Sequence, residues 1–373
     1  MQEDEVMKES VKNILVSLSF VLFIGIGALA CILTPSRETS DSERRKLEQF
    51  PALTMKTVLN TSFMSDFETY TLDQFPLRDT FRRIKSVAHY YLFAQKDNND
   101  IYLADSTVSK LEYPLRESSV AGAAQKFESI YQKYFADKKV NAYYSLIPDK
   151  NYFLAEKNGY PSMNYERLLS LVQENIPSLS YIDIFPYLSL EDYYRTDTHW
   201  KQESILDVAD ALLNGMDVKA EPAEYNHNVF SPFYGVYYGQ AALPLKPDSL
   251  TYLTSDLLDG CTVLDHETGK TGGIYDLSEL SSADPYEVYL YGAAALLSIE
   301  NPNAQTNREL VIFRDSFGSS ITPLLMKGFS KITLVDIRYV ASDLLPQFLD
   351  FSNTTDVLFL YSTMVLNNAT MLK

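Results

Sequence analysis

Two short stretches of this sequence hold side chains that together could transfer an acyl group. The first reads Tyr-Tyr-Arg-Thr-Asp-Thr-His-Trp and contains Asp197 and His199. In an extended segment residues two apart share a face, so Asp197 can hold one ring nitrogen of His199 and leave the other free. The second stretch reads Arg-Asp-Ser-Phe-Gly and contains Ser316. A serine, a histidine and an aspartate are the nucleophile, general base and orienting group of a catalytic triad.

The surroundings of Ser316 favour this reading. The serine follows the apolar run 310–313 and precedes an expected helix from about Ser319 to Lys327. A serine at a strand-to-helix turn points outward, and the amides of the helix start can hold a developing oxyanion. We therefore predict Asp197, His199 and Ser316 as catalytic residues, with the amides of Ser316 and Gly318 as oxyanion donors. A donor from a second loop stays unassigned.

Each motif alone is more often structural, since an Asp-x-His pair is common and an aspartate before a serine often caps a helix. The two motifs taken together with other segments of the sequence are more informative than either motif alone. Both stretches, in this order and about 115 residues apart, together with Ser42–Leu47 and Asp73–Asp79, resemble the DHHW proteins and the alginate O-acetyltransferase-like branch of the SGNH hydrolases. The resemblance covers most of the chain after its first apolar segment. One departure is Arg314, which stands where a glycine often precedes the Asp-Ser pair.

The resemblance implies a function. It implies a serine acyltransferase without a cofactor that adds an acetyl group to a polysaccharide, beside a multispanning membrane O-acyltransferase that supplies acyl groups. A carbohydrate esterase with the same triad is an open alternative. A glycan-binding scaffold without catalysis is another, although a binding module would be free to lose the three residues.

The body of the chain alternates strand-like and helix-like periods, which predicts an α/β fold with a doubly wound parallel sheet. The expected strands are 140–147, 181–184, 310–313, 332–337 and 357–361. A last helix is expected around residues 344–349, between the last two strands. Between residues 216 and 307 the pattern changes to short aromatic pieces punctuated by glycine. We expect an antiparallel excursion there that leaves the sheet and walls one side of a cleft with Tyr234, Tyr237 and Tyr238.

Ligands of such sheets bind at the carboxyl ends of the strands. Arg338 and Tyr339 follow one expected strand and are our first substrate-binding candidates, since arginine grips anions and tyrosine stacks on sugars. Lys150 and Arg195 are two more. Trp200 is expected to be a packing residue.

The N-terminal part begins with residues 14–33, which are 20 uncharged residues, long enough to cross a bilayer as one helix. We expect an uncleaved anchor over 14–34, after a cytoplasmic segment 1–13 and before a tether 35–62; a cleaved signal peptide is the alternative. The acyltransferase domain is then 63–373. It would begin with two short helices packed on the main body. Their apolar positions are Phe63, Phe67 and Tyr70, then Phe81, Ile84, Val87 and Tyr91.

Charge and cysteine content narrow the remaining possibilities. The net charge of −17 argues against nucleic acid, which is bound through clustered Lys and Arg. The four histidines show no metal-ligand spacing, and we expect no disulfide between Cys31 and Cys261. Lys and Arg are more frequent after the apolar run than before it, which by itself places the large domain in the cytoplasm. The family resemblance implies the opposite side, and we expect an extracytoplasmic domain.

Overall fold

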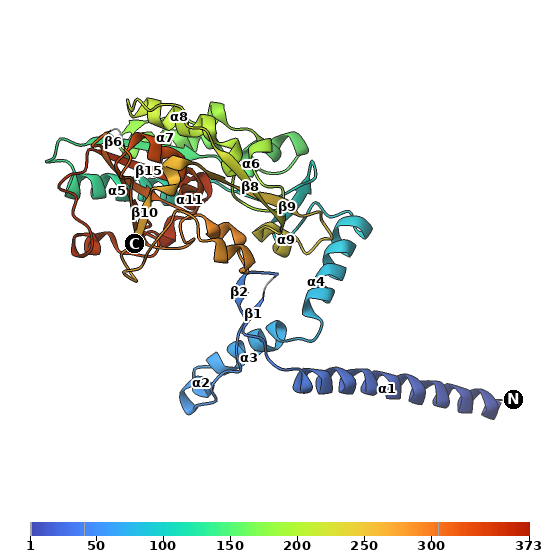
Figure 1. Cartoon of the computed structure of the whole chain (residues 1–373). Helices are drawn as coiled ribbons and strands as arrows, with labels where there is room; N and C mark the ends of the chain where they lie inside the picture. The colour runs from blue at the N-terminus through green and yellow to red at the C-terminus, as the bar shows by residue number, and fades with distance from the viewer. Residues whose placement is uncertain (1, 41, 305) are drawn as a thin grey trace. The chain divides into compact units, whose positions relative to one another are not determined.

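A computed structural model of the chain describes residues 2–40, 42–304 and 306–373. These residues form two compact units, drawn together in Figure 1. The first, which we call the anchor unit, comprises residues 1–93 with 242–244. The second, the sheet unit, comprises residues 94–241 and 245–373. The two units divide near residue 94, whereas the sequence led us to place a domain boundary at residue 63.

The anchor unit is mainly helical. Its elements are α1 (Gln2–Leu33), β1 (Thr39–Ser40), β2 (Arg45–Lys46), α2 (Met55–Leu59), α3 (Ser62–Asp73), α4 (Arg78–Val87) and the π-helical turn η1 (Ala88–Leu92). Within α1, residues Glu9–Leu33 are long and apolar enough to cross a membrane. The two helices expected after residue 62 are confirmed as α3 and α4, which both belong to this unit.

The sheet unit is built on an eight-stranded sheet with the order β11-β10-β12-β14-β13-β15-β6-β7. The strands from β14 to β7 run parallel, and this mostly parallel sheet confirms the expected α/β fold. Their bounds are β6 (Asn141–Ile147), β7 (Ser180–Tyr181), β13 (Glu309–Arg314), β14 (Lys331–Val335) and β15 (Asp356–Ser362). The last strand, β15, lies between β13 and β6, and Figure 1 labels β15 and β6.

Apolar side chains alternate between two cores, one on each face of the sheet. On β13, Leu310 and Ile312 belong to one core, and Val311 and Phe313 to the other. Helices α8 (Leu206–Gly215) and α11 (Phe317–Leu325) pack into the first core, and α5 (Glu117–Tyr134), α7 (Tyr165–Asn175) and α12 (Thr363–Asn367) into the second. Near-continuous apolar strands are what a sheet covered on both faces requires.

The segment from 216 to 307 differs in part from the expected excursion. β8 (Asn226–Phe233) and β9 (Asp248–Thr254) do form a separate antiparallel pair. β10 (Thr262–Asp265), β11 (Thr271–Gly272) and β12 (Leu296–Glu300), however, return to the main sheet and extend it antiparallel beyond β14. Short apolar runs such as Leu296–Ile299 contribute to the core as parallel strands do. The local sequence therefore could not show whether these segments rejoin the main sheet or lie outside it.

The remaining elements are short. They are β3 (Asp97–Asn98), β4 (Ile101–Ala104), β5 (Thr107–Lys110), α6 (Lys150–Leu154), α9 (Val236–Ala241) and α10 (Asp256–Asp259), with 3₁₀ turns η2 (Glu156–Asn158), η3 (Phe185–Tyr187), η4 (Leu190–Asp192), η5 (Gln202–Ser204), η6 (Leu277–Ser281), η7 (Pro285–Val288), η8 (Met326–Gly328), η9 (Ser342–Gln347) and η10 (Ala369–Met371). The helix expected around residues 344–349 is the 3₁₀ turn η9 instead. Pro346 lies inside it and cannot donate the backbone hydrogen bond that an α-helix needs there.

Candidate active site

Asp197, His199 and Ser316 form one chain of hydrogen bonds in the sheet unit. The distance from His199 Nδ1 to Asp197 Oδ1 is 2.7 Å, and that from His199 Nε2 to Ser316 Oγ is 2.8 Å. Asp197 is fully buried, His199 is 8% exposed, and Ser316 is half-buried. An acyl group can therefore reach the serine, while the carboxylate behind the histidine is shielded from water. These are the contacts that a nucleophile, its base and the orienting group require.

The loop that carries the pair is not an extended strand, as the sequence argument had assumed. Residues 195–199 bend between an antiparallel bridge of Tyr193 with Trp200, and the Tyr194 amide donates to His199 O over 3.1 Å. The bend also lets the His199 amide donate to Asp197 Oδ1 over 3.1 Å. The expected contact is present, but a tight loop produces it rather than a shared strand face.

A second chain segment presses against this loop at Gly235. The Val236 amide donates to Asp197 Oδ2 over 2.7 Å, so both carboxylate oxygens are held. A Cβ atom on Gly235 would lie 2.3 Å from Thr196 O and 2.4 Å from Asp197 Cβ, closer than real Cβ contacts. Only glycine fits there. Gly235 is visible in the sequence among aromatic residues, but the sequence does not indicate its close approach to Thr196 and Asp197.

Tyr286 also belongs to the site, although no motif or spacing in the sequence indicated it. Its ring stacks on the imidazole of His199 with centroids 3.8 Å apart and planes 8° from parallel. Its hydroxyl donates to Ser320 Oγ over 2.8 Å, and Trp200 Nε1 donates to the same oxygen over 2.9 Å. Burial raises the pKa of Tyr286, so the phenol stays neutral and remains a donor. Trp200 is fully buried, as expected for a packing residue.

The turn before Ser316 is fixed by Asp315 rather than by a helix cap on the serine. One Asp315 oxygen accepts from the Phe317 amide over 3.0 Å, and the other from the Ser362 amide over 2.8 Å. The Ser316 amide donates to none of the described residues, which leaves it available to an oxyanion. The Gly318 amide donates to Asp315 O over 3.0 Å, so its predicted role as an oxyanion donor is wrong.

The packing of Arg314 explains why a glycine stands at position 318. The arginine is fully buried beside Asp336 at 3.6 Å, and its guanidinium donates to Ala294 O over 3.2 Å. A Cβ on Gly318 would lie 2.7 Å from Arg314 Cβ. The glycine of the motif therefore makes room for the arginine that departs from the family pattern.

Lys150 does not bind substrate at an open surface, contrary to the sequence prediction. Its side chain is 2% exposed, and its ammonium donates to Val108 O, Tyr194 O and Arg195 O. Burial lowers the pKa of Lys150 to about 7. The lysine ties β5 to the loop that leads into Asp197, so its place is in the scaffold of that loop.

The two arginine candidates are also engaged within the protein. Arg195 Nε donates to Asp248 Oδ1 over 3.2 Å, and Arg338 grips Asp336 with two bonds of 2.9 and 2.6 Å. The Arg338 guanidinium, which we expected to bind an anionic substrate, thus binds Asp336 instead. Tyr339, in contrast, is 49% exposed and stays a substrate-binding candidate.

The expected aromatic wall is only partly at the surface. Tyr237 is buried, with its hydroxyl 3.3 Å from Thr198 Oγ1. Tyr234 is exposed and Tyr238 half-buried, with ring centroids 4.6 Å apart. In the described part of the chain no group of three His, Cys, Asp or Glu side chains is placed to hold a metal ion.

A mostly parallel, doubly wound sheet with the serine turn at the carboxyl end of a central strand defines the class of the fold, which is SGNH-hydrolase-like. Solved structures bear this out. A DHHW family protein from Eubacterium siraeum DSM 15702 matches with a TM-score of 0.60 and 22% identity over 74% of this chain and 95% of its own. This match agrees with the sequence resemblance at the level of the fold.

Two structures of PatB1 from Bacillus cereus match as well. The one with a sulfonyl adduct has a TM-score of 0.59 and 20% identity over 72% of this chain and 97% of its own. The other has a TM-score of 0.55 and 19% identity over 74% and 99%. No family model matches the chain, and no curated protein does.

Proposed function

We propose that this protein is a membrane-anchored serine acyltransferase that acts outside the cytoplasm and acetylates a polysaccharide. The observation that carries the proposal is the continuous hydrogen-bonded chain from Asp197 through His199 to the half-buried Ser316 Oγ. The sequence resemblance to the alginate O-acetyltransferase-like branch supports acetyl as the group and a glycan as the acceptor. Glu9–Leu33 supports the anchor.

The reaction has two halves. Ser316 Oγ attacks the acyl carbonyl while His199 Nε2 takes its proton, and the Ser316 amide donates to the oxyanion that forms. The intermediate collapses to an acyl-serine, and the leaving group departs with the proton from His199. A sugar hydroxyl then gives its proton to His199 and attacks the acyl-serine, which releases the ester and restores the serine. Asp197 stabilises the protonated imidazole in both halves.

The nucleophile is tested with the full chain in detergent and an activated acetyl ester. Ser316→Ala and His199→Ala should each remove hydrolysis, because members of a triad act as a unit. Ser319→Ala is the matched control, since this serine lies on the same helix and its buried Oγ has no partner among the described residues. Turnover like that of the parent in a folded Ser316→Ala protein would refute the proposal.

A sulfonyl fluoride gives a second readout that needs no turnover. The activated serine should displace fluoride and keep the sulfonyl group, and one PatB1 structure with a sulfonyl adduct makes the reagent a reasonable choice. Intact mass should rise by one sulfonyl group in the parent and in Ser319→Ala, but not in Ser316→Ala. Labelling that maps to another residue would contradict the assignment.

Transfer and hydrolysis differ in the acceptor. A transferase must hold a sugar hydroxyl well enough to outcompete water at about 55 M, which positioning can supply. The exposed rings of Tyr234 and Tyr339 are surfaces on which a sugar can stack. With an acyl donor and a panel of acidic and neutral oligosaccharides, mass spectrometry should find acylated sugar. If only free acid forms, and acetylated sugars lose their acetyl groups, the protein is an esterase.

The side of the membrane is tested separately. A reporter that is active only in the cytoplasm, fused after Lys373, should stay inactive. An active reporter would place the sheet unit in the cytoplasm, as the Lys and Arg count alone suggests. In cells, we expect a multispanning membrane O-acyltransferase to supply the acyl groups, and purification of the tagged chain should recover such a protein.

A further inference from the structure

Helix α4 presents its apolar side to the outside and its polar side to the interior of the anchor unit. Its outward stripe consists of Phe81, Ile84 and Val87, and it continues to Leu77 just before the helix and to Tyr91 in η1. In chain order the five side chains are 71, 54, 59, 40 and 66% exposed. Ser86, on the opposite side, is buried. A surface helix of a water-soluble domain normally has the reverse arrangement. The helical spacing of Phe81, Ile84, Val87 and Tyr91 had led us to expect that this helix packs on the main body.

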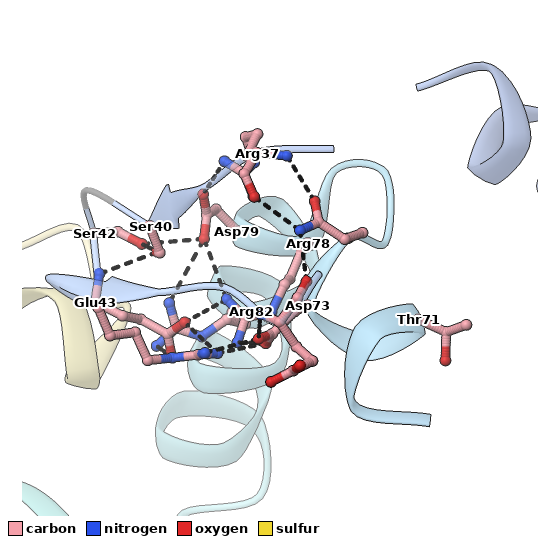
Figure 2. A network of polar contacts seen from close by, with 12 residues as sticks. Arg37, Ser40, Ser42, Glu43, Thr71, Asp73, Arg78, Asp79 and Arg82 are labelled. Atoms are coloured by element: carbon pink, nitrogen blue, oxygen red, sulfur yellow. Dashed lines mark hydrogen bonds and ion pairs between the residues drawn. The ribbon is translucent and has the colours of Figure 1, made fainter. Parts of the chain in front are cut away.

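The inward side of α4 is held by a network of ion pairs that we call the clasp. It consists of Arg37, Glu43, Arg45, Asp73, Arg78, Asp79 and Arg82 and is shown in Figure 2, where most of these residues are labelled. Arg45 donates to both oxygens of Asp73 over 2.8 and 2.5 Å, and Arg78 lies 2.5 Å from Glu43. The clasp thereby joins the two motifs Ser42–Leu47 and Asp73–Asp79, whose chemistry could not be inferred from the sequence.

The set of buried side chains in the anchor unit agrees with this outward placement of apolar residues. Among the described side chains from 9 to 93, Leu47 is the only apolar one that is buried, and the others are Ser40, Asp73 and Ser86. Because Arg78 and Arg82 of α4 pair with Glu43 in the clasp, α4 cannot turn its stripe inward without breaking these ion pairs. The stripe is therefore a fixed outer surface of this unit rather than a displaced core face.

The clasp also fixes how far α4 begins from the end of the candidate membrane span at Leu33. The Arg37 amide donates to Gln74 Oε1 over 2.9 Å, and the Arg37 guanidinium reaches Asp79 in the first turn of α4. Arg37 is four positions after Leu33, a separation of at most about 14 Å. A helix that starts this close to the end of a membrane span begins near the bilayer surface.

Charge favours a lipid surface as well. Residues 34–93 carry nine Lys or Arg against eight Asp or Glu, whereas residues 94–373 carry 21 against 37. The strong negative charge that would repel anionic headgroups is absent from the membrane-proximal segment. Arg83 and Lys85 of α4 are exposed beside the stripe, where cationic side chains meet lipid phosphates in interfacial helices.

We propose that the outward stripe of α4 lies in the headgroup region of the membrane that α1 crosses. The inference rests on the anchor part of the proposed function and is independent of the triad. An interfacial helix buries its apolar face about 5–10 Å below the surface. Lipid then removes from water the apolar area that a soluble domain would bury in a core, and α4 lies along the membrane beside the transmembrane helix.

The test uses the full chain in lipid nanodiscs and single tryptophan substitutions. Trp200 is the only native tryptophan and is fully buried, so it provides a constant background. Phe81→Trp and Tyr91→Trp report on the stripe, and Phe23→Trp reports on α1. Phe348→Trp is the matched control, since Phe348 is an exposed phenylalanine of the sheet unit, 45% exposed. Far-UV circular dichroism checks that each variant is folded.

Lipids with a quencher near the headgroup should reduce the added emission of Phe81→Trp and Tyr91→Trp about twofold or more, since these rings would lie within the reach of that quencher. Phe348→Trp should be quenched by aqueous iodide instead. If Phe23→Trp is quenched by lipid but the two stripe variants are quenched by iodide, the stripe lies in water and the inference is wrong. If neither quencher reaches the stripe, protein covers it and the inference is also wrong. Phe23 lies near the centre of the span, so it is tested with lipids that carry the quencher at the end of the acyl chains. If these lipids do not quench Phe23→Trp, the anchor itself fails, and the inference fails with it.

Discussion

In the sheet unit Trp200, Phe313 and Phe317 are fully buried, and the buried Arg314 is paired with Asp336. In the anchor unit, in contrast, ion pairs hold the helices together while Phe81 and Ile84 are exposed. The two regions come from one chain of ordinary composition. Their difference shows that an apolar period marks a face but does not say which solvent that face meets. The environment of a face has to be inferred from its neighbours in the structure, which here are the clasp and the end of the candidate membrane span.

The largest effect should come from Asp197→Asn, which acts on the sheet unit alone. An amide favours the wrong tautomer of His199, so kcat for the activated ester should fall about 10⁴-fold. The lipid quenching of Phe81→Trp in the same background should not change. A loss of both would show that the two units depend on one another, against the comparison drawn above.

Gly235→Val should cost about a hundredfold in kcat, because the added carbons must push the Asp197 loop out of place and a shift of about 1 Å is enough for such a loss. Gly273→Val is the control, since a Cβ on Gly273 would meet nothing within 4 Å. Ester hydrolysis and thermal melting measure both variants. Equal activity in the two would mean that the close approach at Gly235 is not needed.

Asp73→Asn tests the interior of the anchor unit. Losing the charge that Arg45 and a backbone amide hold should weaken the packing of α3 and α4 by about 1–2 kcal/mol, given the partial exposure of Arg45. Hydrogen exchange in these helices should speed up about tenfold, while ester hydrolysis stays at the level of the parent. Unchanged exchange would mean that apolar contacts, not the clasp, hold the unit together.

The same carboxylate predicts a pH dependence. The hydrogen bonds from Arg45 lower the pKa of Asp73 to about 2, below the value of about 3.9 in an unfolded chain. Its contribution to stability is therefore complete above about pH 4 and is lost as the pH falls toward 2. An acid titration of Phe81→Trp emission should show this step, and the Asp73→Asn variant should lack it.

The smallest effect should come from Tyr286. Tyr286→Leu removes the stacked ring, which is worth about 0.5–1.5 kcal/mol, so kcat should fall a few-fold and KM should change little. Tyr286→Phe keeps the stack and loses only the hydrogen bond to Ser320, and should recover most of the rate. Equal losses in both variants would assign the effect to the hydroxyl instead.

The sequence predicted what depends on local pattern and on pairs of elements. The strands around 310–313 and 357–361 and the meeting of His199 with Ser316 follow from apolar runs and from a serine at a turn. It missed Tyr286, because no spacing relates residue 286 to a histidine 87 positions earlier. It overrated Lys150 and Arg338, because polar residues at strand ends are equally suited to binding a ligand and to binding their own scaffold, and only Asp336 and the buried carbonyls decide between them.

Strand order has a consequence for synthesis. β15 lies between β13 and β6, and the amide of Ser362 at its end holds Asp315 next to Ser316. A chain that has left the ribosome only as far as residue 350 contains Asp197, His199 and Ser316. It lacks β15, the strand that pairs with both β13 and β6. The serine turn is thus completed by a strand that follows Ser316 by about 40 residues. On the proposed function, a chain that stops before β15 should be inert toward acyl esters even though it contains all three residues of the triad.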